Sequence, residues 1–174
     1  MNYSRLKFYD SIDDLKWHNW KWQIANKLSS ISELENITNL SSNEKKALEC
    51  SKILNTAITP YYSIHLNNKE LRKTIIPSKN EFYLSEDEFE DPLGEEEYRR
   101  TPYLIHTYPD KVLFLVNTFC STYCRYCTRS RIVGKPQINY TDYNSTYEYI
   151  KKNKQIRDVL ISGGDPLNMS DTAL

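Results

Sequence analysis

Residues 111–127 read Lys-Val-Leu-Phe-Leu-Val-Asn-Thr-Phe-Cys-Ser-Thr-Tyr-Cys-Arg-Tyr-Cys, an apolar run that leads directly into three closely spaced cysteines. A short apolar run bounded by polar and turn residues favours a strand that is buried on both faces. Asp158–Ile161 is a second such stretch, and Tyr143–Lys152 between them has helical periodicity. The order strand, loop, helix, strand predicts a parallel βαβ unit, so the fold class is α/β.

A parallel unit of two strands is not a finished sheet, because parallel strands need neighbours and helices on both faces. We therefore expect a truncated chain, the N-terminal part of a longer protein, that is inactive by itself. The alternative is a small complete domain with a minimal sheet.

The region before residue 61 is predicted to be a helical arm. A stripe of Trp17, Trp20, Ile24 and Leu28 indicates one helix that begins near Ile12. Two further helices are expected, over Ile31–Ile37 and Ser42–Ala57. In the latter, Ser41 is the N-cap and Glu44 its capping-box partner, and Thr59-Pro60 ends the helix.

Three regions follow from these patterns: a helical part (1–60), a mixed linker and lead-in (61–110), and the start of the α/β unit (111–174). Within the linker, Tyr61–Leu71 could form another short helix. The stretch Ser85–Glu97 is strongly acidic, and the simplest interpretation of such a charge run is a solvated segment.

Composition excludes several classes of protein. The 174 residues contain 23 Lys and Arg and 23 Asp and Glu, so the chain has no basic excess for nucleic acid or an anionic membrane. The mean hydropathy is −0.68, and no apolar run approaches the about 20 residues of a membrane span. The N-terminus has no apolar stretch typical of a secretory signal. We therefore expect a cytoplasmic protein.

The strongest chemical signal is the spacing of Cys120, Cys124 and Cys127. Thiolates are the usual ligands of iron–sulfur clusters, and three ligands on a four-iron cubane leave one iron open to a small molecule. Zinc is the alternative metal, with Cys50 or His106 as a fourth ligand, but a second C-x₂-C pair is missing. A disulfide framework fits poorly without signs of secretion.

The C-x₃-C-x₂-C pattern resembles the radical S-adenosylmethionine superfamily. Tyr126 matches the aromatic residue that often precedes the last cysteine there. The turn Ser162-Gly163-Gly164-Asp165-Pro166 stands where that superfamily has its glycine-rich motif. The resemblance implies a 4Fe-4S cluster on the three cysteines and S-adenosyl-L-methionine bound near Tyr126, Ser162, Gly163, Gly164 and Asp165.

Further stretches resemble the lysine 2,3-aminomutase family. These are Trp17–Gln23, Asp91–Leu93, Tyr108–Val116, Thr128–Arg131 and Ser162–Leu167. Family members move an amino group between C2 and C3 of an α-amino acid, with pyridoxal 5′-phosphate as a further cofactor. The resemblance thus implies an isomerase with the first βαβ unit of a partial (β/α) TIM-like barrel. It also implies a small amino acid substrate, an electron donor such as flavodoxin or ferredoxin, and a homo-oligomer when complete.

The resemblance assigns roles to individual residues. Arg129 would hold the substrate α-carboxylate, which a guanidinium fork matches in two parallel hydrogen bonds; the alternative is a solvent-facing arginine at a helix start. Lys111 would contribute to the pyridoxal phosphate site, but Thr107 replaces an arginine that is usual there. The lysine that carries the pyridoxal is absent, so no catalytic residue is assigned in this chain.

Other residues are interpreted as structural. Arg125 and Arg131 are expected to be structural or surface residues, the tryptophans to be packing residues, and Cys50 to be a small buried hydrophobe. The substrate stays open: lysine is favoured, with glutamate, arginine or a lysine side chain in an elongation factor as alternatives. A non-catalytic zinc or iron–sulfur module is the alternative from another class.

Overall fold

The computed structural model describes residues 5–50, 55–135 and 143–172. The described chain is a mixed α/β protein with one four-stranded sheet and several helices. It divides into two compact units, which are treated separately below. The first comprises residues 1–86 and 121–127, and the second comprises residues 87–120 and 128–174.

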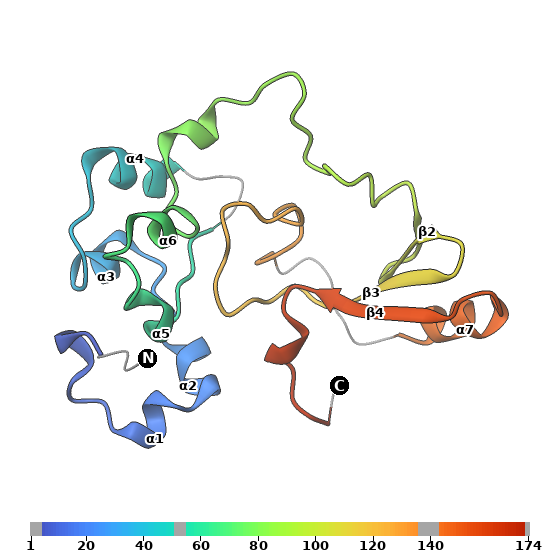
Figure 1. Cartoon of the computed structure of the whole chain (residues 1–174), viewed down its shortest axis with the longest axis horizontal. Coiled ribbons are helices and arrows are strands. Elements are labelled where there is room, and N and C mark those ends of the chain that lie inside the picture. The colour runs from blue at the N-terminus through green and yellow to red at the C-terminus, as the bar shows by residue number, and fades with distance from the viewer. Residues whose placement is uncertain (1–4, 51–54, 136–142, 173–174) are drawn as a thin grey trace. The chain divides into compact units, whose positions relative to one another are not determined.

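The first unit is helical (Figure 1, blue to green). Its α-helices are α1 (Asp14–Trp17), α2 (Trp20–Ala25), α3 (Ile31–Glu35), α4 (Ser42–Cys50), α5 (Pro60–Ser63) and α6 (Lys69–Lys73). Two short 3₁₀ helices are η1 (Lys7–Tyr9) and η2 (Lys79–Phe82). The core of this unit consists of aliphatic side chains from the helices and their connections: Leu28, Leu34, Ile58, Leu66, Ile75 and Ile76.

Several helical predictions need correction. The single helix from Ile12 is wrong, because the Asn19 side chain accepts hydrogen bonds from the N–H groups of Lys21 and Trp22 and so starts a new helix. The predicted helix over Ser42–Ala57 is confirmed as α4 up to Cys50; residues 51–54 lie outside the described residues, and residues 55–57 are not helical. Pro60 begins α5 rather than ending a helix, since its missing N–H costs nothing at a first position.

Two other expectations in this unit are wrong. The stretch Tyr61–Leu71 is not one helix, because α5 ends at Ser63 and α6 is capped separately by Asn68. Cys50 is exposed at the end of α4 rather than buried. The packing interpretation of Trp17 fits: it is 5% exposed, and its ring lies 5.4 Å from that of Tyr9 and 6.3 Å from that of Tyr61.

The second unit contains the sheet, with strands β1 (Arg99–Thr101), β2 (Leu104–Tyr108), β3 (Lys111–Asn117) and β4 (Asp158–Gly163) in the order β1-β2-β3-β4. The predicted parallel pair is confirmed, because β3 and β4 run parallel with α7 (Asn144–Lys152) between them in sequence. The short 3₁₀ helix η3 (Pro166–Asn168) follows β4.

Strands β1 and β2 are antiparallel additions within the stretch interpreted as linker. The hairpin β2–β3 turns at Pro109-Asp110, and Tyr108 pairs with Lys111. Proline and aspartate both favour turns, and this pair is visible in the sequence.

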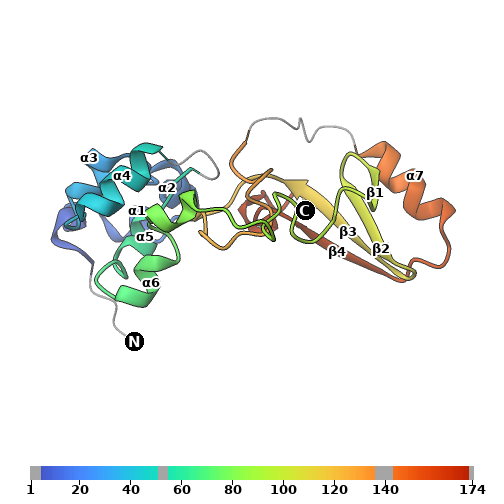
Figure 2. The same cartoon turned by 90° about the horizontal axis from the view of Figure 1, so that it is seen from above.

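Helix α7 covers one face of the sheet (Figure 2). Because side chains alternate along a strand, Val112, Phe114 and Val116 share that face and pack with Tyr149 and Ile150 of α7. The Thr101 and Thr146 hydroxyls also meet there, 2.7 Å apart. Strand β4 was expected to be buried, but Leu160 is 65% exposed, because it lies on the sheet face opposite α7 and on the last strand of the described sheet.

None of the helices in the described residues is both long and apolar enough to cross a membrane.

Candidate functional site: a cavity on the open face of the sheet

The glycine turn after β4 lies directly against the end of β3. Gly164 N donates to Asn117 O at 2.8 Å, and Asp165 N donates to Phe119 O at 2.6 Å. The Asn117 side chain closes the contact, since its Nδ2 donates to Asp165 O at 3.0 Å. A side chain at either glycine would collide with this backbone, so the close approach requires glycine. The turn thus fixes the backbone that leads into Cys120.

The sheet face opposite α7 lines a cavity of about 360 Å³. Lys111 and Leu113 from β3 reach it, together with their parallel partners Asp158 and Leu160 on β4. Arg129, Glu95 and Thr107 also line this cavity, as do Leu93, Ile105, Tyr108 and Val112. The structure therefore brings Arg129 and Lys111 to one cavity, as the predicted roles require, and places Thr107 beside them.

Arg129 does not face solvent, so that alternative is wrong. Its side chain is 18% exposed and forms an ion pair with Glu95, whose side chain is 6% exposed. Arg129 Nε lies 3.0 and 3.1 Å from the two Glu95 carboxylate oxygens, and Nη2 lies 2.7 Å from Oε1. Arg129 Nη1 donates to Ser162 Oγ at 3.3 Å. This contact links Arg129 to the predicted S-adenosylmethionine turn.

Glu95 belongs to a wider ion-pair network. Arg131, which is 10% exposed, contacts Glu95 at 3.0 Å, Glu96 at 3.1 Å and Asp91 at 3.2 Å. Hydrogen bonding by Arg99, opposed by burial and aided by the charges of Arg99 and Arg131, lowers the pKa of Glu96 to about 2. Part of the acidic run is therefore a set of ion-pair partners, and the solvated interpretation is wrong for Asp91 and Glu95.

The segment between the first and last cysteines is anchored in the helical unit. Tyr123 N donates to Ala57 O at 3.0 Å, and Arg125 N donates to Thr74 O at 2.7 Å. The Arg125 side chain is 7% exposed and forms an ion pair with Glu81 of η2. The structural interpretation of Arg125 and Arg131 is therefore confirmed.

The three cysteine thiols are half-exposed. Cys120 belongs to the sheet unit, whereas Cys124 and Cys127 belong to the helical unit. Across the residues that the structure describes, no group of three or more His, Cys, Asp or Glu side chains is placed to hold a metal ion. Metal binding itself supplies the free energy that gathers thiolate ligands, so the fit to a cluster rests on the chemistry and spacing of these thiols.

Tyr126, next to the last cysteine, is 71% exposed. A hydrogen bond with Cys124 and the negative charge of that thiolate raise the pKa of Tyr126. An exposed phenol beside two thiols is accessible to a ligand approaching the cysteine loop.

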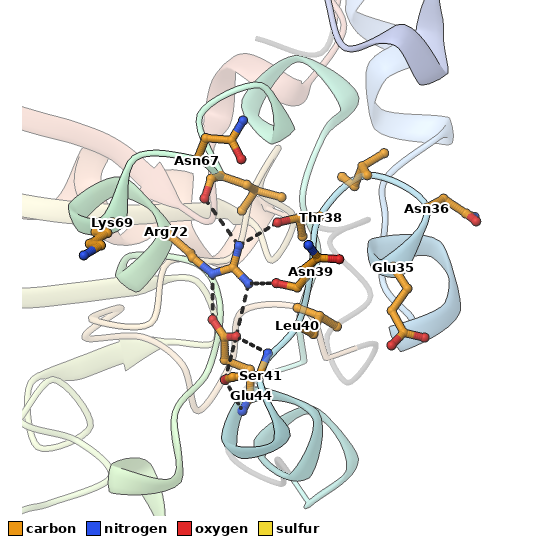
Figure 3. A pocket seen from close by; sticks show the side chains of 12 residues that line it. Glu35, Asn36, Thr38, Asn39, Leu40, Ser41, Glu44, Asn67, Lys69 and Arg72 are labelled. Carbon is orange, nitrogen blue, oxygen red and sulfur yellow. Dashed lines mark hydrogen bonds and ion pairs between the residues drawn. The ribbon is translucent and has the colours of Figure 1, made fainter.

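A larger, more open cavity in the helical unit surrounds Arg72 (Figure 3). Arg72 Nε and Nη2 bind the Glu44 carboxylate at 2.6 and 3.1 Å. Its other bonds go to Thr38 Oγ1, Asn39 O and Leu66 O. Because every nitrogen of the guanidinium already has an acceptor, the cluster has no donor nitrogen in reserve, and we interpret it as a structural clamp.

Sequence reasoning missed Glu95, the buried partner of the predicted carboxylate-binding arginine. The available signal was weak: three consecutive glutamates are followed by Arg99 and Arg100, but the partner residue lies 34 positions away. From the sequence, His106 was considered only as a possible fourth ligand of the alternative zinc site. In the structure its Nδ1 lies 2.9 Å from the Tyr149 hydroxyl, which is a structural contact between β2 and α7.

These features define an α/β protein in which a cavity with an arginine and a lysine lies on one face of a parallel strand pair. The same chain carries a cysteine loop and a glycine turn. Comparison with known proteins identifies the family to which the chain belongs. An L-lysine 2,3-aminomutase of Fusobacterium nucleatum is 40% identical over 178 residues, covering 98% of this chain. Another, from Acetoanaerobium sticklandii, is 38% identical over 175 residues, covering 97%. Over nearly its whole length the chain belongs with the N-terminal part of the L-lysine 2,3-aminomutase family.

The similarity extends to a second named activity. A glutamate 2,3-aminomutase of Clostridioides difficile is 34% identical over 167 residues, covering 91% of this chain and 39% of that enzyme. The chain spans 42% of the length of each of the two lysine enzymes. No family model matches the chain.

Proposed function

We propose that this chain is part of an amino acid 2,3-aminomutase, an isomerase, with L-lysine as its substrate. The observation that carries the proposal is the shared cavity of Arg129 and Lys111, in a chain homologous to enzymes with this name. L-Glutamate is the second candidate, because a relative named glutamate 2,3-aminomutase is also homologous over most of the chain.

In this proposal Arg129 binds the α-carboxylate of the substrate and Lys111 binds the phosphate of pyridoxal 5′-phosphate. Both contacts pair a cation with an oxyanion. Lys111 is exposed in the cavity wall, so its ammonium can reach a ligand. Thr107 contributes a hydroxyl but no charge to the same cavity. In this proposal Lys111 therefore supplies the positive charge that pairs with the phosphate.

The cysteine loop and the glycine turn are proposed to serve one reaction centre. Cys120, Cys124 and Cys127 would hold a 4Fe-4S cluster, while Tyr126 and residues 162–165 would contact S-adenosyl-L-methionine. Cluster and cosubstrate together would supply a carbon radical, with the electron coming from a donor such as flavodoxin or ferredoxin. What this chain supplies is the loop geometry, since Asn117 and Gly164 fix the backbone before Cys120.

We further propose that the sheet belongs to a partial (β/α) barrel. In such barrels the helices lie outside, the opposite strand faces line the interior, and the active site lies at the carboxyl ends of the strands. The β3–α7–β4 unit agrees with this arrangement in that α7 covers one face and the cavity lies on the other. Arg129 reaches Ser162 near the carboxyl end of β4, whereas the cavity extends along the sheet face to Lys111 and Asp158 at the amino ends of β3 and β4.

The cluster assignment predicts different outcomes for the four cysteines. Alanine at Cys120, Cys124 or Cys127 in the full-length protein should abolish cluster assembly, because a cubane cannot lose one of only three protein ligands and stay bound. Cys50→Ala is the matched control, since Cys50 is exposed on α4. Iron and sulfide are measured after anaerobic reconstitution. Loss of the cluster in Cys50→Ala, as complete as in the other three variants, would exclude the three-ligand site.

The carboxylate assignment predicts a loss that does not depend on the substrate side chain. Arg129→Lys keeps the charge but removes the planar fork, so kcat/KM should fall roughly thirtyfold or more, about 2 kcal/mol. The loss should be similar for every amino acid that the full-length enzyme accepts, among lysine, glutamate and arginine. Arg100→Lys, at an exposed position, is the control. An unchanged kcat/KM would remove Arg129 from the site, and a loss confined to one substrate would make it a side-chain reader.

A further inference from the structure

Glu95 holds one particular edge of the Arg129 guanidinium. A guanidinium has five N–H donors and can bind a carboxylate at its Nε/Nη2 edge or at its Nη1/Nη2 edge. Glu95 takes the Nε/Nη2 edge, with the shortest distance, 2.7 Å, between Nη2 and Oε1. Ser162 Oγ accepts from Nη1. In the described part of the chain these bonds use three donors, leaving one N–H on Nη1 and one on Nη2.

Glu95 is itself held firmly. Its side chain is 6% exposed, and Arg131 Nη2 binds its Oε2 at 3.0 Å from the other side. Arg131 is in turn fixed by Asp91 and Glu96. A carboxylate between two guanidiniums and away from water has little freedom to rotate, because its desolvated charge must keep both partners.

We propose that Glu95 is a positioning residue: by occupying the Nε/Nη2 edge of Arg129, it reserves the Nη1/Nη2 edge for the carboxylate of an amino acid in the cavity. The inference rests on the proposed function, in which Arg129 binds that carboxylate. The edge reserved for the substrate includes Nη1, which meets Ser162 of the glycine turn, so the bound carboxylate is oriented toward that turn.

The alternative role for Glu95 is competition with the substrate carboxylate for Arg129. A competing Glu95 would be displaced by the substrate carboxylate, and removing its charge would strengthen carboxylate binding. A positioning Glu95 gives the reverse, because a guanidinium released from it no longer presents a fixed fork. The two roles therefore predict changes of opposite sign in one measurable ratio, the affinity for a free carboxylate relative to its amide.

The experiment uses the cofactor-loaded full-length protein without reductant, so that binding is measured without turnover. L-Lysine and L-lysinamide are titrated calorimetrically into wild type, Glu95→Gln, Glu95→Asp and Glu97→Gln. We expect wild type to bind lysine at least about tenfold more tightly than lysinamide, as for one charged hydrogen-bond pair. Glu95→Gln should reduce this ratio to about threefold or less by weakening lysine binding alone. Glu97→Gln is the matched control, because Glu97 is an exposed glutamate two positions further along the chain, and its ratio should equal that of wild type.

A ratio in Glu95→Gln that equals or exceeds that of wild type overturns the inference. Should Glu95→Gln fail to fold, as seen by thermal unfolding, Glu95→Asp decides, because its carboxylate is withdrawn by one methylene and the charge is kept; it should also lower the ratio. The proposed function fails separately: a wild-type ratio near one, unaffected by Arg129→Lys, would show that Arg129 binds no substrate carboxylate.

Discussion

Gly164→Ala should unfold the sheet unit or destabilise it by about 3 kcal/mol or more. A Cβ at this position would lie 2.7 Å from the backbone N and C of Phe119, and closer still to its O. The backbone cannot move aside cheaply, because Gly164 N and Asp165 N both donate to this part of the chain. Gly163→Ala should be at least as costly, since Gly163 has a φ of +119° and its Cβ would collide with Asn117 O.

Gly94→Ala is the control for this prediction. Gly94 has a φ of +62°, but a Cβ there would meet no atom within 4 Å. Its cost should therefore be about 1 kcal/mol, the penalty for a left-handed residue without a collision. The unfolding free energies of the Gly164→Ala and Gly94→Ala variants are measured by urea unfolding of the full-length protein, monitored by a spectroscopic signal of the sheet unit. Equal midpoints for Gly164→Ala and Gly94→Ala would show that the close approach of the turn to β3 is absent in solution.

Arg72→Met should strongly destabilise the helical unit. Arg72 and Glu44 are 17% and 20% exposed, and the guanidinium also binds Thr38, Asn39 and Leu66. Methionine keeps much of the side-chain volume but leaves the Glu44 carboxylate without its cation. Removing one member of a largely buried ion pair leaves the other charge uncompensated, so we expect a loss of about 3 kcal/mol.

The pH dependence of stability gives an independent readout of the same clamp. Burial opposes ionisation of Glu44, but the hydrogen bonds from Arg72 and Ser41 outweigh it and lower the pKa from 4.5 to about 2. A lowered folded-state pKa stabilises the protein above pH 4.5, and this contribution is lost as the pH falls toward 2. Wild type should lose about 3 kcal/mol from this group across that interval, and Arg72→Met should lose much less.

Lys73→Met is the matched control for the clamp. Lys73 pairs with Glu70, but the two side chains are 73% and 78% exposed, and such pairs contribute little. Its free energy of unfolding should stay close to that of wild type from pH 2 to 7. A pH profile of Arg72→Met that runs parallel to that of Lys73→Met would contradict the clamp.

Prediction from sequence succeeded where a short stretch carries its own signal. The continuous apolar runs of β3 and β4 and the helical periodicity of α7 predicted a parallel βαβ unit, which is confirmed. The capping box of Ser41 and Glu44 is also present. Prediction failed where two local signals compete, as at Asn19, whose cap interrupts an otherwise helical apolar stripe.

The candidate site shows the same division. Cys120, Arg129, Gly163 and Gly164 were recognised because each belongs to a contiguous motif. The contacts that make Arg129 part of a site were not, because Glu95 and Ser162 lie 34 and 33 positions from it. The family resemblance predicted that Arg129 binds the substrate carboxylate. The structure adds that the Glu95 carboxylate already binds the Nε/Nη2 edge of the Arg129 guanidinium.

The sequence by itself determined the β3–α7–β4 unit, the capping box of Ser41 and Glu44 and the two motifs, because caps, turns and short apolar runs are set by residues within a few positions of one another. Only the tertiary structure decided which charges meet: Glu44 is an N-cap partner in sequence and a clamp for Arg72 in space, and Glu95 looks solvated in sequence but is buried against Arg129. The reason is physical. An ion pair acts over a few ångströms, and the path of the chain, which no local pattern encodes, decides which distant residues come within that range.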